Sequence, residues 1–331
     1  MKKIVAVEIT SDYVRGVELE NPFTSKPKLV AFGEVSLAQG AAGESEIFDI
    51  EVVKDALLEL WKTCKFSTKQ VALGLGGRKI LIRDYETPVA ELTKIRANLK
   101  FEAANLLPAQ IGNAVLDFYP TGLKLSDTGL ELVQGLLIAA PSEPTEKIIA
   151  VLQSAGLDVQ IVDFLPFGIA RVARKAFGAD GDYLLVNVKG YSTDIIAMKQ
   201  GIPQMIRMIP NGILVRDNIA GKHRGVADAA ASFAGGEVTP TDPVDSIISG
   251  LRNTISFYGN KGGKPTAILL AGEGSLSLEL QEKLPQALQL RTGLLDMASA
   301  IELPKKSTVD DAIMKAAALS VLGVGMRGLR G

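Results

Sequence analysis

The sequence of 331 residues predicts an α/β protein whose two similar lobes face a shared cleft. The first observation behind this prediction is a pattern that occurs twice: a short apolar run, one acidic or amide residue, a polar turn and a second apolar run. Residues 4–19 and 183–198 align so that Glu8 corresponds to Asn187. β-Branched residues on both sides of a polar turn favour a two-stranded hairpin. Two such hairpins indicate two related halves of the chain.

The second observation is a glycine-rich turn between an apolar run and a helical pattern, in residues 267–284. Small residues in such a turn let the backbone approach a ligand closely, and Ser275 is expected to cap the following helix. Two hairpins and one glycine-rich turn, in this order and at this spacing, are similar to the nucleotide cleft of actin-like ATPases. In that arrangement the two hairpin turns direct backbone N–H groups at the phosphates, and an acidic residue at a strand end orients a hydrated Mg²⁺.

A resemblance to one family extends over nearly the whole chain. Beyond the opening hairpin, it is carried by residues 79–88, 95–108, 117–119, 155–157, 162–163 and 316–327. In this order, these segments resemble the type IV pilus assembly protein PilM family, which belongs to the actin-like ATPase superfamily and is related to FtsA. The resemblance implies a duplicated, ribonuclease H-like fold of two lobes, with an α+β subdomain inserted in the first lobe.

The resemblance also implies ATP and Mg²⁺ as cofactors and gives the positions at which they would bind, with Glu8 as the metal position. The cofactor positions are Glu8, Thr10, Ser11, Asp12 and Arg15 in the first turn, Asn187, Lys189, Gly190, Tyr191, Ser192 and Thr193 in the second, and Gly272, Glu273, Gly274 and Ser275 in the third. No catalytic residue is identified, so binding without efficient turnover is the expectation, and a pseudo-ATPase with a degenerate nucleotide cleft is the alternative.

Four of these positions depart from the family pattern, which usually has Asp at the strand ends and Gly in the turns. Glu8 still offers a carboxylate, whereas Asn187 lacks the charge that a hard cation favours. Thr10 is β-branched where the family uses the conformational freedom of glycine. Lys189 either replaces part of a metal's charge or is an ordinary solvated turn residue.

The resemblance implies a scaffold that docks the N-terminal cytoplasmic tail of a PilN-like inner-membrane protein and meets other pilus assembly components. An extended peptide would add to a strand edge, or fill a groove between the first lobe and the insert. The candidate contact residues are Leu81, Arg83, Leu107 and Pro108. The alternative for each is a place in the insert's own core. An active ATPase and an FtsA-like membrane-associated filament subunit are the alternative functions.

Composition limits the other classes of function. The 36 basic and 37 acidic residues give a net charge of −1, so no nucleic-acid partner is expected. The N-terminal apolar run is interrupted by Glu8 and Asp12, which favours a strand over a signal peptide. The one cysteine, Cys64, is expected to be a buried thiol. A cytoplasmic protein at the inner face of the cell membrane, held there by its partners, is the expectation.

The expected organisation follows the duplication. Residues 1–68, 158–182 and 307–331 would form the first lobe, 69–157 the insert, and 183–306 the second lobe with a small insertion at 213–236. In the insert we expect strands at 71–75, 79–85 and 131–139 and helices at 89–106 and 144–155. A helix at 50–64 would close the first part of lobe one. The last helix, at 310–321, would either lie on a membrane or pack back on the first lobe, and burial is favoured.

Overall fold

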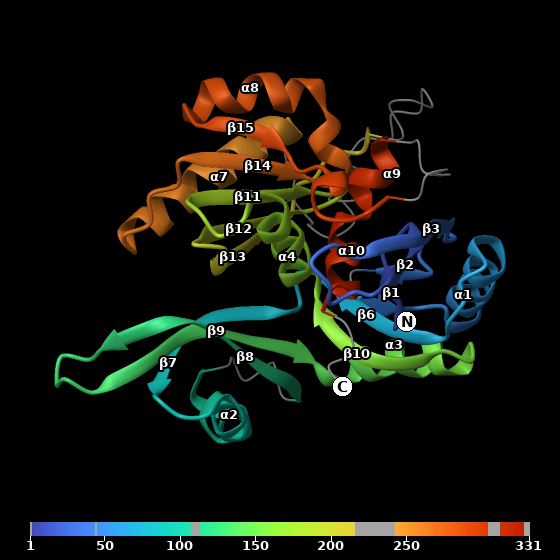
Figure 1. Ribbon diagram of the computed structural model, residues 1–331, viewed down its shortest axis with the longest axis horizontal. Helices are drawn as coiled ribbons and strands as arrows, with labels where there is room; N and C mark the ends of the chain where they lie inside the picture. The colour runs from blue at the N-terminus through green and yellow to red at the C-terminus, as the bar shows by residue number, and fades with distance from the viewer. Residues whose placement is uncertain (1, 44, 107–112, 216–241, 304–311, 328–331) are drawn as a thin grey trace, which may run out of the picture.

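The computed structural model describes residues 2–43, 45–106, 113–215, 242–303 and 312–327 (Figure 1). Two five-stranded mixed sheets form the cores of two lobes, and a three-stranded sheet stands beside them. The predicted α/β two-lobe fold with an α+β insert is confirmed. No helix in these ranges is long and apolar enough to cross a membrane.

The sheet of the first lobe has the order β10-β6-β1-β2-β3. Strands β1 (Lys3–Ile9) and β2 (Tyr13–Glu20) form the predicted hairpin, and Glu8 pairs with Arg15 in it. Strands β6 and β10 run parallel to β1. The remaining strands are β3 (Lys28–Ser36), β6 (Gln70–Leu75) and β10 (Asp158–Phe164), with a two-stranded ribbon of β4 (Ala42–Gly43) and β5 (Glu46–Ile47). Helix α1 (Ile50–Cys64) packs on β2 and β3.

The second lobe repeats this plan in the order β13-β12-β11-β14-β15. Strand β11 (Asp182–Val188) pairs antiparallel with β12 (Thr193–Lys199) and parallel with β14 (Ala267–Ala271), so the second predicted hairpin is also confirmed. Asn187 pairs with Asp194, at the position that corresponds to Glu8 and Arg15 in the first hairpin. The other elements of this lobe are β13 (Ile202–Ile209), β15 (Arg291–Leu294), α7 (Pro243–Asn260), η1 (Glu273–Leu276), α8 (Leu278–Leu288) and η2 (Met297–Ser299).

Two helices connect the lobes at the centre of the molecule. Helix α4 (Leu165–Phe177) contacts strands of both large sheets, and α10 (Leu319–Gly325) packs on α4, β1 and β2 (Figure 1). Every residue of α10 is buried, because its apolar and small side chains fit between these elements. The structure divides the expected C-terminal helix into α9 (Ala312–Ala317) and α10. The expected burial is confirmed for α10 and for Ala317, whereas the rest of α9 is partly or fully exposed.

The insert is a small sheet of order β7-β9-β8 with α2 (Leu92–Leu106) packed on β8. Its strands are β7 (Leu81–Pro88), β8 (Ala114–Leu125) and β9 (Glu131–Pro141). Its own core includes Phe118, Leu99 and Leu137. The sheet also touches β13, so the insert contacts the second lobe.

Two elements expected in the insert lie elsewhere. The strand expected at 71–75 is β6, which pairs with β1 and β10 in the sheet of the first lobe. Helix α3 (Ser142–Ser154) packs mainly on α1, β5 and β10. Both differences arise because partners distant in sequence decide where an apolar segment packs. The exact division of the chain into domains stays a prediction, and the small insertion expected at 213–236 falls almost wholly outside the described residues.

Candidate functional site

The first hairpin turn satisfies its backbone donors with its own side chain. The hydroxyl oxygen of Thr10 accepts from the backbone nitrogens of Asp12 and Tyr13, at 3.3 and 2.9 Å. The backbone nitrogen of Thr10 donates to the carbonyl of Tyr13 at 2.9 Å, and Ser11 Oγ donates to Asp12 Oδ2 at 3.0 Å. A threonine hydroxyl that accepts from nearby backbone N–H groups fixes a compact turn. Two donors that could face an anion are therefore already bonded.

A buried ion network lies behind this turn. Arg15, which is 4% exposed, contacts Glu8 Oε2 at 3.5 Å and Glu34 Oε2 at 3.0 Å. Its Nη1 also donates to the carbonyl of Ala317 at 3.2 Å. Burial raises the pKa of Glu8, and the opposing effects of the Arg15 and Lys189 charges do not outweigh it. Burial lowers the pKa of Arg15, but the nearby carboxylates, led by Glu273, raise it above its ordinary value overall.

The second hairpin turn holds a matching network of different chemistry. Asn187, which is 2% exposed, donates through Nδ2 to Asp194 Oδ2 and to Ser320 Oγ, each at 3.1 Å. Lys189 Nζ lies 3.2 Å from Asp194 Oδ2, and the Lys189 side chain is 21% exposed. Lys189 is thus paired with a buried carboxylate, which decides against the alternative of an ordinary solvated turn residue.

The rest of the second turn is covered by the chain that follows β13. The backbone nitrogen of Ile213 donates to the carbonyl of Lys189 at 2.9 Å. A Cβ added at Gly190 would meet Leu214 Cδ2 at 2.9 Å. Ser192 and Thr193 are buried, Thr193 Oγ1 donates to the carbonyl of Asn211 at 2.7 Å, and Tyr191 is exposed.

The glycine-rich turn packs against the end of β11. Gly272 has φ of 79°, and a Cβ there would lie 2.3 Å from the carbonyl oxygen of Val188 and 2.7 Å from Asn187 Oδ1. Gly274 is packed as closely on Val188. Glycine is required here both for the left-handed backbone and for the close approach of the two segments.

The helix after this turn is capped by a different serine from the one expected. Ser277 Oγ accepts from the backbone nitrogen of Leu280 at 3.3 Å, so Ser277 is the N-cap of α8. Ser275 lies inside η1 and donates to the carbonyl of Gly272 at 2.7 Å. The prediction of Ser275 as the cap was wrong, because a 3₁₀ turn separates the strand from the helix.

The structure therefore brings the three predicted turns together around one set of charges. The pKa of Glu8 responds to Lys189, Glu273 and Asp194, which belong to the other lobe. Sequence reasoning missed Glu34, Asp194 and Ser320. Asp194 could have been found, because it corresponds to Arg15 when the two hairpins are aligned.

The side chains at this site do not fit Mg²⁺. Mg²⁺ prefers carboxylate and water oxygens, whereas Asn187 directs its amide nitrogen to Asp194, and Asp194 already holds the ammonium of Lys189. Glu8 is held by Arg15. The described parts of the chain contain no group of three His, Cys, Asp or Glu residues able to hold a metal ion. Glu8 is thus an ion-pair partner in this structure, which does not support its predicted role as a metal ligand.

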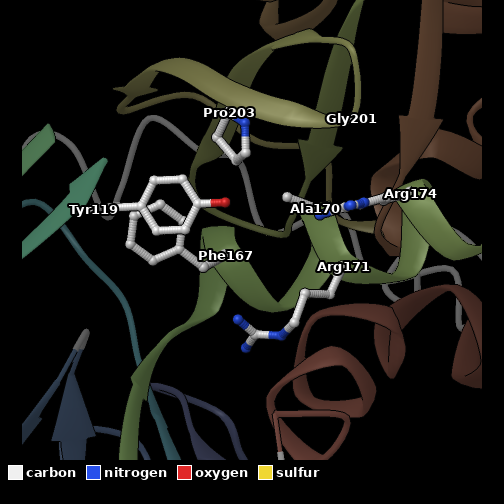
Figure 2. Close-up of a pocket in the computed structure, with 7 residues that line it drawn as sticks. All are labelled: Tyr119, Phe167, Ala170, Arg171, Arg174, Gly201 and Pro203. Atoms are coloured by element: carbon white, nitrogen blue, oxygen red, sulfur yellow. The ribbon is translucent and has the colours of Figure 1, made fainter. Parts of the chain in front are cut away.

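A separate cavity of about 30 Å³ lies where the insert, α4 and the β12–β13 turn meet. Figure 2 shows the ring of Tyr119 over Phe167, with the Tyr119 hydroxyl directed toward the space between Pro203 and Ala170. The two rings stack with centroids 4.5 Å apart. Arg171, Arg174 and Gly201 complete the lining. This cavity has room for about one water molecule. It is too small for a nucleotide-sized ligand, which needs roughly 300 Å³ or more.

Two of the four candidate contact residues for a partner lie on β7. Arg83 is exposed and Leu81 is half-buried, and neither belongs to the core of the insert. Leu107 and Pro108 fall outside the described residues.

Comparisons with known proteins agree with this architecture. A family model described as type IV pilus assembly protein PilM matches residues 6–189. Among solved structures, a PilM–PilN type IV pilus biogenesis complex contains a chain of 20% identity and TM-score 0.81, with 99% of each chain covered. The ethanolamine utilization protein EutJ from Carboxydothermus hydrogenoformans is 12% identical with a TM-score of 0.51, covering 99% of this chain and 90% of that one. A search of curated proteins gives no match. With more than half of its length matched by the family model, the chain belongs to the type IV pilus assembly protein PilM family and has the actin-like ATPase fold.

Proposed function

We propose that this protein is a cytoplasmic scaffold of type IV pilus assembly that docks the N-terminal tail of a PilN-like inner-membrane protein. The observation that carries the proposal is the likeness to a chain of a PilM–PilN complex over 99% of both chains, in a member of the PilM family. The tail would hold the scaffold at the inner face of the cell membrane, next to other pilus assembly components.

The insert offers a surface suited to an extended peptide. In the described residues β7 pairs with β9 alone, so its second edge carries backbone groups that a further strand can bond. Strand addition gives affinity through backbone hydrogen bonds, and side chains that alternate along the strand give specificity. Leu81 and Arg83 lie two residues apart on one face of β7 and present an apolar and a cationic group. We place the tail along this edge.

The test is a calorimetric titration of the full chain with a synthetic peptide of the tail of the PilN-like protein from the same cell. We expect Arg83→Glu to weaken binding at least about tenfold, because a desolvated charge contact is worth roughly 1.5–3 kcal/mol. Leu81→Asp should weaken it similarly by placing a charge in the contact.

The matched control is Arg291→Glu, which makes the same charge change on the exposed edge strand β15 of the second lobe. Tail binding should be unchanged in this variant. Absence of binding by the parent protein would contradict the docking proposal. Equal binding by the parent and Arg83→Glu would place the tail elsewhere.

The alternatives are an active ATPase and an FtsA-like filament subunit. The paired side chains of the cleft give a hydrolase no support, and the burial of α10 gives none to membrane attachment through that helix. Phosphate release, sedimentation of polymers and flotation with anionic liposomes would detect these activities. A nucleotide-stimulated polymer or a liposome-bound fraction would replace the scaffold proposal.

A further inference from the structure

We propose that the cleft between the lobes is closed by the protein's own side chains, with the Thr10 hydroxyl in place of a phosphate oxygen and the Lys189 ammonium in place of a bound cation. The lobes then associate without Mg·ATP. This inference concerns the cleft and does not depend on the docking proposal.

The turn after β1 carries backbone N–H groups that an anion could bind. Successive backbone N–H groups in a turn form a site for an anion. Here the N–H groups of Asp12 and Tyr13 converge on Thr10 Oγ1, at 3.3 and 2.9 Å. An incoming phosphate oxygen would have to displace this hydroxyl, so it would gain little beyond what the turn already has.

The second hairpin holds a buried carboxylate that is already neutralised. Asp194 is 1% exposed and receives both the Asn187 amide and the Lys189 ammonium. Lys189 also lies near enough to Glu8 of the first lobe to lower the pKa of that carboxyl. The ammonium of Lys189 thus neutralises the buried carboxylate of Asp194, and its charge also acts on Glu8 of the first lobe, as the charge of a bound cation would.

The C-terminal segment connects the side-chain networks of the two hairpins. The carbonyl of Ala317 accepts from Arg15 of the first lobe at 3.2 Å, and the hydroxyl of Ser320 accepts from Asn187 of the second at 3.1 Å. These two groups lie three residues apart in the chain, and together they bond to both lobes.

Thermal unfolding of the full chain with and without millimolar Mg·ATP tests the inference. We expect no shift in the melting temperature of the parent and no calorimetric heat of binding. The variant Thr10→Gly/Asn187→Asp/Lys189→Gly removes the hydroxyl and the ammonium and adds a carboxylate. In this variant Mg·ATP should raise the melting temperature by about 3 °C or more, because a ligand that binds only the folded state stabilises it.

The matched control is Thr128→Gly/Asn260→Asp/Lys26→Gly, which makes the same chemical changes at exposed positions. It should show no response to Mg·ATP. Should the triple cleft variant fail to give a cooperative transition, Thr10→Gly/Lys189→Gly is the second variant, with the same expectation.

Saturable binding of Mg·ATP by the parent would overturn the inference, whatever the variants do. A folded cleft variant without a response would equally overturn it, because other features would then close the cleft. The assay contains no peptide, so its outcome is independent of whether the tail docks.

Discussion

The side-chain amide of Asn187 in the second lobe donates a buried hydrogen bond to the hydroxyl of Ser320 in helix α10, with Nδ2 and Oγ 3.1 Å apart. The same amide donates to Asp194, so both of its hydrogens are directed at protein oxygens. This pairing makes the C-terminal helix part of the cleft and gives Asn187 a role that an aspartate could not fill without adding a second negative charge beside Asp194.

Loss of the Ser320 hydroxyl should destabilise the protein. Ser320→Ala leaves one buried N–H of Asn187 without its acceptor, and we expect the free energy of unfolding to fall by about 1–3 kcal/mol. Urea denaturation followed by circular dichroism measures this. Ser299→Ala, at an exposed position, should stay within about 0.5 kcal/mol of the parent. Equal stability of the two variants would show that this hydrogen bond contributes little.

Removal of the Lys189 charge should lower the free energy of unfolding more than loss of the Ser320 hydroxyl does. Lys189→Met keeps the unbranched shape and most of the length of the side chain. It leaves the carboxylate of Asp194 buried with the Asn187 amide as its remaining polar partner among the contacts described above. Breaking a buried ion pair from one side costs roughly 3 kcal/mol. The control Lys199→Met changes an exposed residue at the end of β12. If both substitutions lower the urea midpoint by the same amount, the Lys189–Asp194 pair does not stabilise the cleft.

The stability of the protein should depend on pH through the titration of Glu8. Its pKa in the folded protein is raised above the ordinary value of 4.5, mainly by burial. As the pH rises from 4.5 through the folded pKa, the unfolded chain loses this proton first, so the folded state loses stability. Glu8→Gln removes the titration, and its stability relative to the parent should therefore increase with pH over this window.

Urea denaturation of both proteins at a series of pH values above and below 4.5 provides the measurement. Glu59→Gln, on the exposed face of α1, should follow the parent curve. Parallel curves for Glu8→Gln and the parent would mean that Glu8 does not titrate differently on folding.

The elements that could be predicted are those whose signal is local. Both hairpins follow from β-branched runs around polar turns, and helix 50–64 was placed to the residue by its apolar spacing. The position of β6 in the sheet of the first lobe could not be predicted from local sequence, because its partners β1 and β10 lie far from it in the chain. The same reason hid Ser320, which reaches Asn187 only after both lobes fold. Local sequence also could not separate Ser275 from Ser277, since the 3₁₀ turn between them depends on the packing of Gly272 and Gly274 on β11.

The closest approach between α4 and α10 gives the last prediction. A Cβ on Gly323 would lie 1.8 Å from the carbonyl oxygen of Gly168, and a Cβ on Gly168 would lie 2.5 Å from that of Ser320. Backbone cannot yield as a flexible side chain does, so Gly323→Ala must push α10 away from α4 and strain its bonds to the cleft. We expect a loss of about 3 kcal/mol in the free energy of unfolding. In the control Gly259→Ala, the added methyl has no heavy atom within 4 Å, and the greater helix propensity of alanine should leave α7 unchanged or up to about 1 kcal/mol more stable. Urea denaturation of the two variants measures these changes. A Gly323→Ala protein as stable as the parent would show that the two helices are not held in contact at this crossing.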